Sequence, residues 1–323
     1  MTVGSINLTT NAIELAAVLS AEVLLPLKRN FCLAAFCNKG YSKDFGVKGS
    51  TVTVFTLGHH TVQDFVDGTP IYPLQPEAPG SVVLPCNRFK TVDFLISSAL
   101  RTQTDIDHFR SQLATAYTDL AEAIEAVIAA QAVNLTNQVG SSGSDLQYED
   151  LASIKRKLTD AACPQYLFNQ PNGVNLIVSP KDEESLLNDD RIITSSSRGL
   201  VGQEGPIMTG NIGRALGMDI YVNQLIYSTG SAPNLTYHGM ALAPDALALV
   251  SKPLKEPTSK NVETSYVVLP LNPSKAAPAG TDSGIVFRIT MGWDPDYRAD
   301  RCAIDCLFDV HTLRANQGVE ILS

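Results

Sequence analysis

The sequence from Gly205 to Val222 reads GPIMTGNIGRALGMDIYV, in which four glycines lead directly into an apolar strand. Gly205 and Gly210 have the spacing that opens a phosphate-binding P-loop. Such a loop next requires Lys and then Ser or Thr, to reach the phosphates and to hold Mg²⁺. Asn211 and Ile212 stand at those two positions. The groups that would perform the chemistry are therefore missing.

The dinucleotide-binding pattern G-x-G-x-x-G fails as well, because Met208 stands where its first glycine belongs. What remains is a run of turns feeding a strand, for which glycine is suited because it adopts positive φ without strain. We predict a structural role for the turn glycines of the chain: Gly49, Gly210, Gly213 and Gly217. No other segment carries a stronger catalytic motif, so the sequence predicts a protein that is not an enzyme and uses no cofactor.

Composition describes a globular chain with an acidic balance. The 323 residues are 44% apolar and 18% charged, with a formal net charge of −9. This excess of acids argues against a protein whose main task is to grip nucleic-acid phosphates. No secretion signal is recognisable and no apolar run reaches the roughly 18 residues of a membrane span. We therefore expect folding in a cytoplasm, with the six cysteines as reduced thiols.

Two alternating segments predict a protruding hairpin. Residues 48–55, KGSTVTVF, alternate as a strand should, and residues 92–96 alternate in a second strand. The loop between them is kept extended and unable to form helix by four of its prolines: Pro70, Pro73, Pro76 and Pro79. The pattern is two strands joined by a long excursion.

A long helix is predicted over residues 105–133. Thr104 and Asp107 form a capping box at its start, and its apolar residues recur at steps of three and four: Ile106, Phe109, Leu113, Tyr117, Leu120, Ile124 and Val127. Twenty-nine residues at about 1.5 Å each make a rod of roughly 44 Å.

The rest of the chain predicts a mixed α+β protein. Residues 145–270 alternate helix and strand, and residues 273–284 are a linker rich in Pro, Gly, Ala and Ser. In the stretch 301–311 every even position is apolar and most odd positions are polar. That pattern predicts one long strand with a single buried face.

The metal-binding patterns of the sequence are weak. Cys302 and Cys306 share a strand face, but no second Cys or His pair stands nearby, so buried apolar thiols are the better interpretation. His59 and His60 lie in a polar loop without acids at metal spacing. The acidic stretch 294–300 begins like a calcium loop but lacks its turn glycine and its final Glu. We predict no metal site.

Several local patterns, in chain order, resemble the major capsid proteins of tailed double-stranded-DNA bacteriophages with the Hong Kong 97-type fold. The segment 48–54 resembles the strand that enters the extended loop of that family, and the capped helix 105–133 resembles its spine helix. The segments 209–221 and 237–243 resemble parts of its axial domain, and residues 298–313 resemble the return strand of its peripheral domain.

This resemblance implies a division of the chain into an N-terminal arm (1–40), an extended loop (41–97), a peripheral domain (98–139 and 285–323, with spine helix 105–133) and an axial domain (140–284). It also implies pentamers and hexamers that close into an icosahedral shell around phage DNA, assembled in the bacterial host cytoplasm. The implied partners are other copies of the chain, a scaffolding protein, a portal, possibly a decoration protein, and non-specific contact with double-stranded DNA. No membrane is involved.

Charged residues supply candidates for contacts between subunits. In this family the extended loop overlies a neighbouring subunit, so the acids of the loop are expected to meet basic residues across the interface. The acids are Asp64, Asp67 and Glu77, and the densest basic clusters are Lys28 and Arg29, and Lys155, Arg156 and Lys157.

Two other functions remain open. An encapsulin-like nanocompartment is a shell of the same fold around an enzyme cargo. An α/β enzyme with a site in the loop 188–217 is the alternative from a different class.

Overall fold

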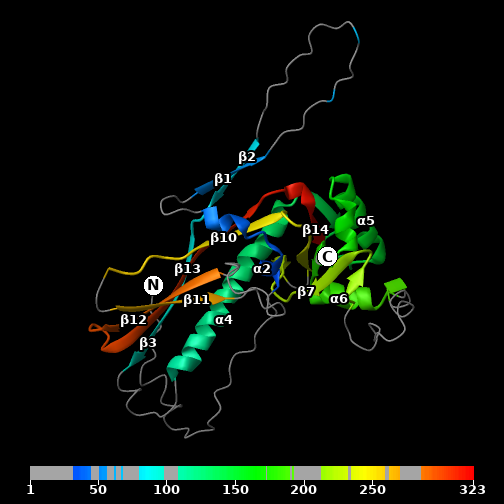
Figure 1. The fold of residues 1–323 in the computed structure, drawn as a ribbon. Coiled ribbons are helices and arrows are strands. Elements are labelled where there is room, and N and C mark those ends of the chain that lie inside the picture. Colours follow the sequence, from blue (N-terminus) through cyan, green and yellow to red (C-terminus); the bar gives the residue numbers. More distant parts are fainter. Residues whose placement is uncertain are drawn as a thin grey trace.

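The computed structural model describes residues 32–44, 51–56, 62, 67, 80–97, 108–171, 173–189, 191–192, 212–231, 234–258, 262–269 and 285–323. Two sheets, a long helix and a projecting hairpin make up this part of the chain (Figure 1). The segment 193–211, which holds Gly205 and Gly210, lies outside it, as does Gly49.

A five-stranded antiparallel sheet is built around one long strand. It contains β3 (Arg88–Ser97), β10 (Leu247–Lys252), β11 (Val262–Leu269), β12 (Ile285–Asp294) and β13 (Ala299–Thr312). Ile304 of β13 pairs with Val92 of β3 on one side and with Ile289 of β12 on the other. The even positions from 302 to 310 are all buried, as the alternation predicted for residues 301–311 requires. The single buried face is not strict, because Asp305 and Asp309 at odd positions are also buried, each paired with an arginine.

Helix α4 (His108–Ala129) covers one face of this sheet (Figure 1). Leu120, Ile124 and Ile128 are buried against sheet residues such as Phe287 and Ile304. The helix was predicted to run to residue 133, but its last turn tightens into a 3-10 helix, η2 (Ala130–Asn134). Residues 105–107 lie outside the described part.

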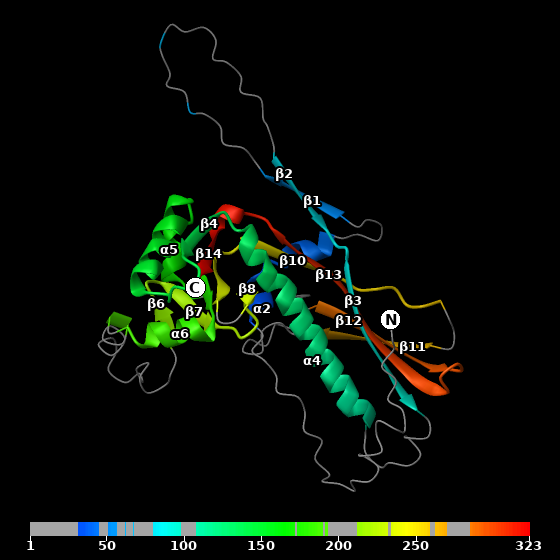
Figure 2. The ribbon, with the colours of Figure 1, turned by 180° about the vertical axis from the view of Figure 1, so that it is seen from behind.

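A second, mixed sheet has the order β4-β14-β9-β5-β7-β6, with β8 paired to β9. Its strands are β4 (Asn137–Gly140), β5 (Asn175–Val178), β6 (Arg214–Ala215), β7 (Met218–Val222), β8 (Tyr227–Ser231), β9 (Asn234–Leu242) and β14 (Gly318–Leu322). Helices α5 (Tyr148–Asp160) and α6 (Pro180–Leu187) cover one face, together with the short helix η3 (Gln165–Asn169) (Figure 2). The other face packs toward α4, because Ile177, Met240 and Leu242 belong to the same core as Leu120.

The sheets do not follow the division predicted at residue 284. Strands β10 and β11 fall within the segment 140–284, yet they hydrogen-bond to β13 and β12 of the five-stranded sheet. Strand β14 falls within 285–323 but pairs with β9 and β4 of the mixed sheet. The prediction grouped residues by position along the chain, whereas strand pairing joins segments that are far apart in sequence.

The hairpin consists of β1 (Thr51–Thr56) and β2 (Gly80–Pro85). Its first strand was predicted to pair with residues 92–96, which is wrong: those residues are part of β3 and pair with β13. Cys86 and Asn87 alone separate β2 from β3. The inward side of the hairpin packs Val54 and Leu84 toward Val250, and its strands project beyond the sheet (Figure 1).

The described part of the arm lies along the five-stranded sheet. It contains α2 (Leu33–Phe36) and η1 (Gly40–Asp44). Between them the Asn38 amide donates to the Leu247 carbonyl at 2.8 Å, and the Leu249 amide donates to the Asn38 carbonyl at 2.9 Å. Residue 38 thus extends the edge at β10 by one parallel bridge.

The turn into β7 uses two glycines with left-handed backbone. Gly213 has φ of +68° and Gly217 has φ of +89°. A Cβ at Gly217 would lie 2.5 Å from the Phe168 carbonyl oxygen, so a larger residue cannot fit without moving backbone. Arg214 braces the turn by donating to the Gly217 carbonyl at 3.2 Å.

Candidate assembly surfaces

The outward side of the hairpin is uncharged and exposes two large apolar side chains. Phe55 is 71% exposed and Val83 is 52% exposed. They share this side with Thr51 and Thr53, while the alternate residues face the body. Strands β1 and β2 contain no charged side chain. An exposed, uncharged strand pair that projects from the body is typical of a protein–protein contact surface.

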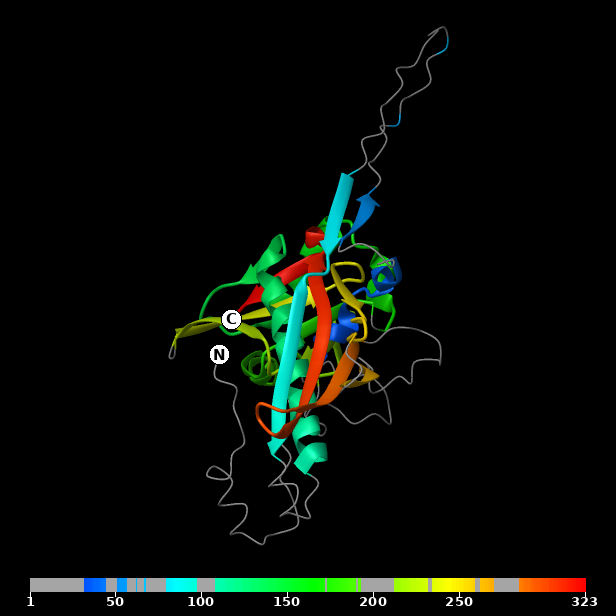
Figure 3. The ribbon, with the colours of Figure 1, turned by 90° about the vertical axis from the view of Figure 1, so that its left-hand side faces the viewer.

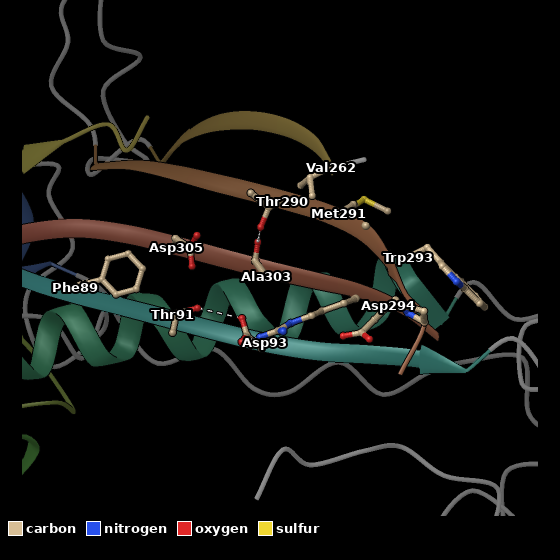
Figure 4. Close-up of a pocket in the computed structure, with 13 residues that line it drawn as sticks. Phe89, Thr91, Asp93, Val262, Thr290, Met291, Trp293, Asp294, Ala303 and Asp305 are labelled. Carbon is tan, nitrogen blue, oxygen red and sulfur yellow. Dashed lines mark hydrogen bonds and ion pairs between the residues drawn. The ribbon is translucent and has the colours of Figure 1, made fainter. Parts of the chain in front are cut away.

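The five-stranded sheet has an open groove of about 550 Å³ on the side away from α4 (Figure 4). Its floor is formed by outward-facing residues of β3, β12 and β13, including Thr91, Thr290 and Ala303. Phe89 stands at one end and Trp293 at the other, and each exposes more than half of its surface (Figure 4). Exposed aromatic rings rimmed by polar groups are typical of protein interfaces.

Ion pairs neutralise most of the charge in this groove. Arg301 Nη2 lies 2.7 Å from Asp93 Oδ2, and the Thr91 hydroxyl donates to the other oxygen of Asp93 at 3.1 Å. Arg288 donates to Asp305 at 2.5 and 3.1 Å, and Asp305 is only 5% exposed. The groove therefore offers aromatic and apolar contacts without a strong net charge.

The predicted basic cluster lies elsewhere, on α5 beside the mixed sheet. Lys155 Nζ lies 5.3 Å from the centre of the Phe168 ring, Arg156 pairs with Asp160 at 4.0 Å, and Lys157 donates to the Gln138 carbonyl. Each of the three thus has a contact within its own subunit.

Among the predicted acidic partners, Asp67 is exposed. Asp64 and Glu77, and the basic pair Lys28 and Arg29, lie outside the described residues. Contact between the acids and the basic clusters therefore stays a prediction.

The cysteines behave as buried thiols. Burial raises the pKa of Cys302 to about 11 and that of Cys306 to about 12. His311 points elsewhere, with Nε2 3.0 Å from the Pro85 carbonyl oxygen. Within the described ranges, no three His, Cys, Asp or Glu side chains are grouped to hold a metal ion.

One arrangement has the order of a catalytic triad. His238 lies between Glu320, 2.6 Å from Nδ1, and Thr229, 2.8 Å from Nε2. These side chains come from three adjacent strands of the mixed sheet, and His238 and Glu320 are both less than 10% exposed. The open groove lies on the other sheet. The network therefore cross-links strands and has no described access for a substrate.

Sequence reasoning missed both apolar surfaces. Phe55 was assigned to a strand, but the sequence did not show which side of the strand it occupies. Phe89 and Trp293 were not assigned to strands at all. Part of a signal was present, since Phe89 stands at an odd position of a strand whose even positions 92, 94 and 96 are apolar. Such an aromatic faces away from the core.

The chain was compared with known proteins. No protein-family model matches it, and no curated protein matches its sequence. A chain from Mycobacterium phage Che8 is similar in structure, with a TM-score of 0.70, 20% identity, and coverage of 94% of this chain and 96% of that one.

Two further similar structures are described as capsids. A chain of the bacteriophage PhiM1 mature capsid has a TM-score of 0.64 at 11% identity and covers 94% of this chain and 90% of that one. A chain of the cyanophage P-SCSP1u capsid has a TM-score of 0.60 at 12% identity, with coverage of 94% and 91%. The chain therefore has a phage capsid fold. None of its described helices is long and apolar enough to cross a membrane.

Proposed function

We propose that this chain is the structural major capsid protein of a tailed bacteriophage, with the Hong Kong 97-type fold. It assembles through pentamers and hexamers into an icosahedral shell that encloses double-stranded DNA, and it performs no catalysis. The observation that carries the proposal is the pair of uncovered surfaces, the outward side of the hairpin and the groove. Similarity over nearly the full length to phage capsid chains supports the same conclusion.

The proposed domains follow the sheets. The peripheral domain is the five-stranded sheet with α4, and the axial domain is the mixed sheet with α5 and α6. Residues 1–40 are the arm. The extended loop (41–97) contains the hairpin and ends in β3, the strand that it shares with the five-stranded sheet. A scaffolding protein, a portal, a decoration protein and non-specific contact with DNA complete the proposed partners. Assembly is proposed to take place in the host cytoplasm, and the mature location is the virion.

The two uncovered surfaces are complementary in chemistry. The hairpin presents Phe55 and Val83 without charge, and the groove presents Phe89 and Trp293. Two of the groove's acids, Asp93 and Asp305, are held in ion pairs. Burying apolar surface stabilises an interface by roughly 25 cal/mol per Å². We propose that the hairpin of one subunit lies over the groove of the next, which closes both surfaces at once.

Negative-stain electron microscopy and sedimentation of the purified protein test the proposal. Closed shells or capsomers are expected, and a compact, stable monomer with a ligand bound near residues 188–217 would favour an enzyme instead. Packaged DNA distinguishes a phage shell from a nanocompartment, which would contain cargo protein.

A substitution tests the surface itself. Phe55→Asp places a charge on the outward side of the hairpin and is expected to abolish shell formation while leaving the circular dichroism spectrum unchanged. Phe55→Leu keeps the side apolar and is the matched control. Normal shells from Phe55→Asp would exclude this side of the hairpin as an interface.

A further inference from the structure

Glu125 of α4 is a buried carboxylate that contacts segments from two other parts of the chain. It is 3% exposed. The Leu33 amide donates to Oε2 and the Ala34 amide to Oε1, both at 3.0 Å. The Asn223 side-chain amide donates to Oε2 at 3.3 Å. One side chain thus binds the arm and the residue that follows β7.

The partners of Glu125 are all neutral. Burial raises the pKa of Glu125, and the amides of Ala34, Leu33 and Asn223 act against that rise by stabilising the charged form. Among the described residues no Lys, Arg or His forms an ion pair with it. A buried carboxylate is costly unless its oxygens are fully hydrogen-bonded. Each of these donors therefore matters, and losing one leaves an oxygen lone pair unsatisfied.

Asn223 is held rigidly by the mixed sheet. It is fully buried, its backbone amide donates to the Val178 carbonyl at 3.1 Å, and its Oδ1 accepts from the Leu225 amide at 2.7 Å. These bonds fix the side-chain amide so that its Nδ2 faces Glu125. Any displacement of the mixed sheet relative to α4 therefore carries this donor with it.

The arm is held at a second place that does not involve the mixed sheet. Beyond the bridge at Asn38, the Ser251 amide donates to the Ser42 hydroxyl at 3.3 Å. Residues 38–42 are thus bound to β10, while Leu33 and Ala34 are bound to Glu125. The two attachments hold opposite ends of the segment 32–44, which we call the arm base.

We propose that Glu125 is a latch that couples docking of the arm base to the seating of the mixed sheet against α4. With Asn223 in place, Glu125 is saturated by donors and holds α2. When Asn223 moves away, the carboxylate loses a donor and its hold on Leu33 and Ala34 weakens. By reciprocity, undocking the arm weakens the contact between α4 and the mixed sheet. The latch acts within one subunit and is independent of shell formation.

Trypsin cleavage after Lys39 in the full chain measures release of the arm base. Lys39 is half-buried and follows Asn38, whose amide and carbonyl are both bonded to β10, so cleavage requires that segment to open. Asn223→Asp keeps the acceptor for Leu225 but turns a second carboxylate toward Glu125. We expect cleavage to accelerate by about tenfold, because like charges repel and a donor is lost.

A compensating pair makes the test specific. In the double variant Glu125→Gln with Asn223→Asp, the Gln amide nitrogen takes the place of Oε2 and donates to the new carboxylate. The Gln oxygen still accepts from the Ala34 amide, while the Leu33 amide loses its acceptor. The double variant is therefore expected to be cleaved more slowly than Asn223→Asp and several-fold more slowly than the product of the two single effects, which is the non-additivity that direct coupling produces. Asp119→Asn, at an exposed position of α4, is the matched control and should leave the rate unchanged.

The outcomes separate clearly. Rescue by the double variant supports the latch. Two single effects that multiply in the double variant, or single variants that cleave at the original rate, would overturn it. If Asn223→Asp does not fold, hydrogen exchange of Glu125→Gln alone decides: coupling predicts lost protection both in residues 32–37 and around 223–225. Loss confined to the arm contradicts the proposal.

Discussion

The two sheets differ in how many of their faces are covered. In the mixed sheet all four residues of β5 are buried, because α5 and α6 cover one face and the core around α4 covers the other. In the five-stranded sheet β13 largely alternates, because α4 covers one face and the other carries the groove. The first sheet is an internal support, and the second offers a surface to a partner. Helix α4 lies between the two sheets, and its buried residues belong to one hydrophobic core with residues of both.

The largest expected effect comes from the core that both sheets share. Leu120 is 1% exposed and packs in it. Leu120→Asp places an unpaired charge there and should lower the free energy of unfolding by at least about 4 kcal/mol. In urea unfolding, both sheets should lose structure in one transition at a lower midpoint. Two separate transitions would contradict a shared core.

A matched control for Leu120 lies next to it on the helix. Glu122 lies off the apolar stripe, but it is half-buried and engaged in a contact, so Glu122→Ala is a poor control. Asp119 is exposed and is the sharper choice. Asp119→Ala should change the midpoint little.

The next effect concerns the open face of the five-stranded sheet. Arg288→Ala leaves Asp305 buried without its cation, which should cost about 3 kcal/mol. Asp93→Ala breaks the more exposed pair with Arg301 and should cost less than about 1 kcal/mol. Urea midpoints of the two variants measure the difference. Equal losses of unfolding free energy would mean that the pair of Arg288 and Asp305 is as accessible to water as the pair of Asp93 and Arg301.

Thiol ionisation gives a smaller, pH-dependent effect. The pKa values of Cys302 and Cys306, about 11 and about 12, lie above the ordinary 9.0. A raised folded-state pKa contributes stability that is present below pH 9 and is lost as the pH rises from 9 toward 12. Stability should therefore fall between pH 9 and 11. Replacing both thiols by Ala should reduce this slope without abolishing it, because burial raises the pKa of Cys32, Cys37 and Cys86 as well. An unchanged slope would assign the dependence to groups other than Cys302 and Cys306.

The smallest effect is expected from the acids of the extended loop. If Asp64 and Asp67 meet basic residues of a neighbour, each exposed pair contributes at most about 1 kcal/mol. Replacing both by Asn should lower shell stability at low salt and matter less at about 1 M, where screening is nearly complete. An equal loss at every salt concentration would show that these acids do not act through intersubunit electrostatics.

The sequence predicted elements whose periodicity is local. The apolar stripe that contains Leu120 and the alternation of β13 could both be recognised in the sequence. Each element is buried mainly on one face, and that burial repeats apolar residues at the period of a helix or of a strand. Strand β2 was not assigned, since prolines stand at both of its ends and its valines are adjacent. Strands β4 and β14 were also missed, because they have four and five residues and gain their pairing from distant segments.

The candidate surfaces were harder to predict than the fold. Their residues are ordinary apolar side chains, and only tertiary structure decides which of these remain uncovered. Glu125 was missed for a related reason. On a helix an acid beside an apolar stripe is typical of a solvent-facing edge, and nothing local shows that α2 and Asn223 enclose it.

The connection between β2 and β3 has a mechanical consequence. Figure 3 shows β3 running on in the direction of β2, with a two-residue step between them. A pull on the tip of the hairpin is therefore transmitted along β3. There it loads the ten-residue register with β13 in shear, so many hydrogen bonds share the load instead of breaking one by one. Arg88 forms an ion pair with Asp309 at 2.9 Å, which strengthens the end of the register that lies beside the hairpin. The hairpin can thus pass a load on the extended loop to the five-stranded sheet, where β13 receives it as shear.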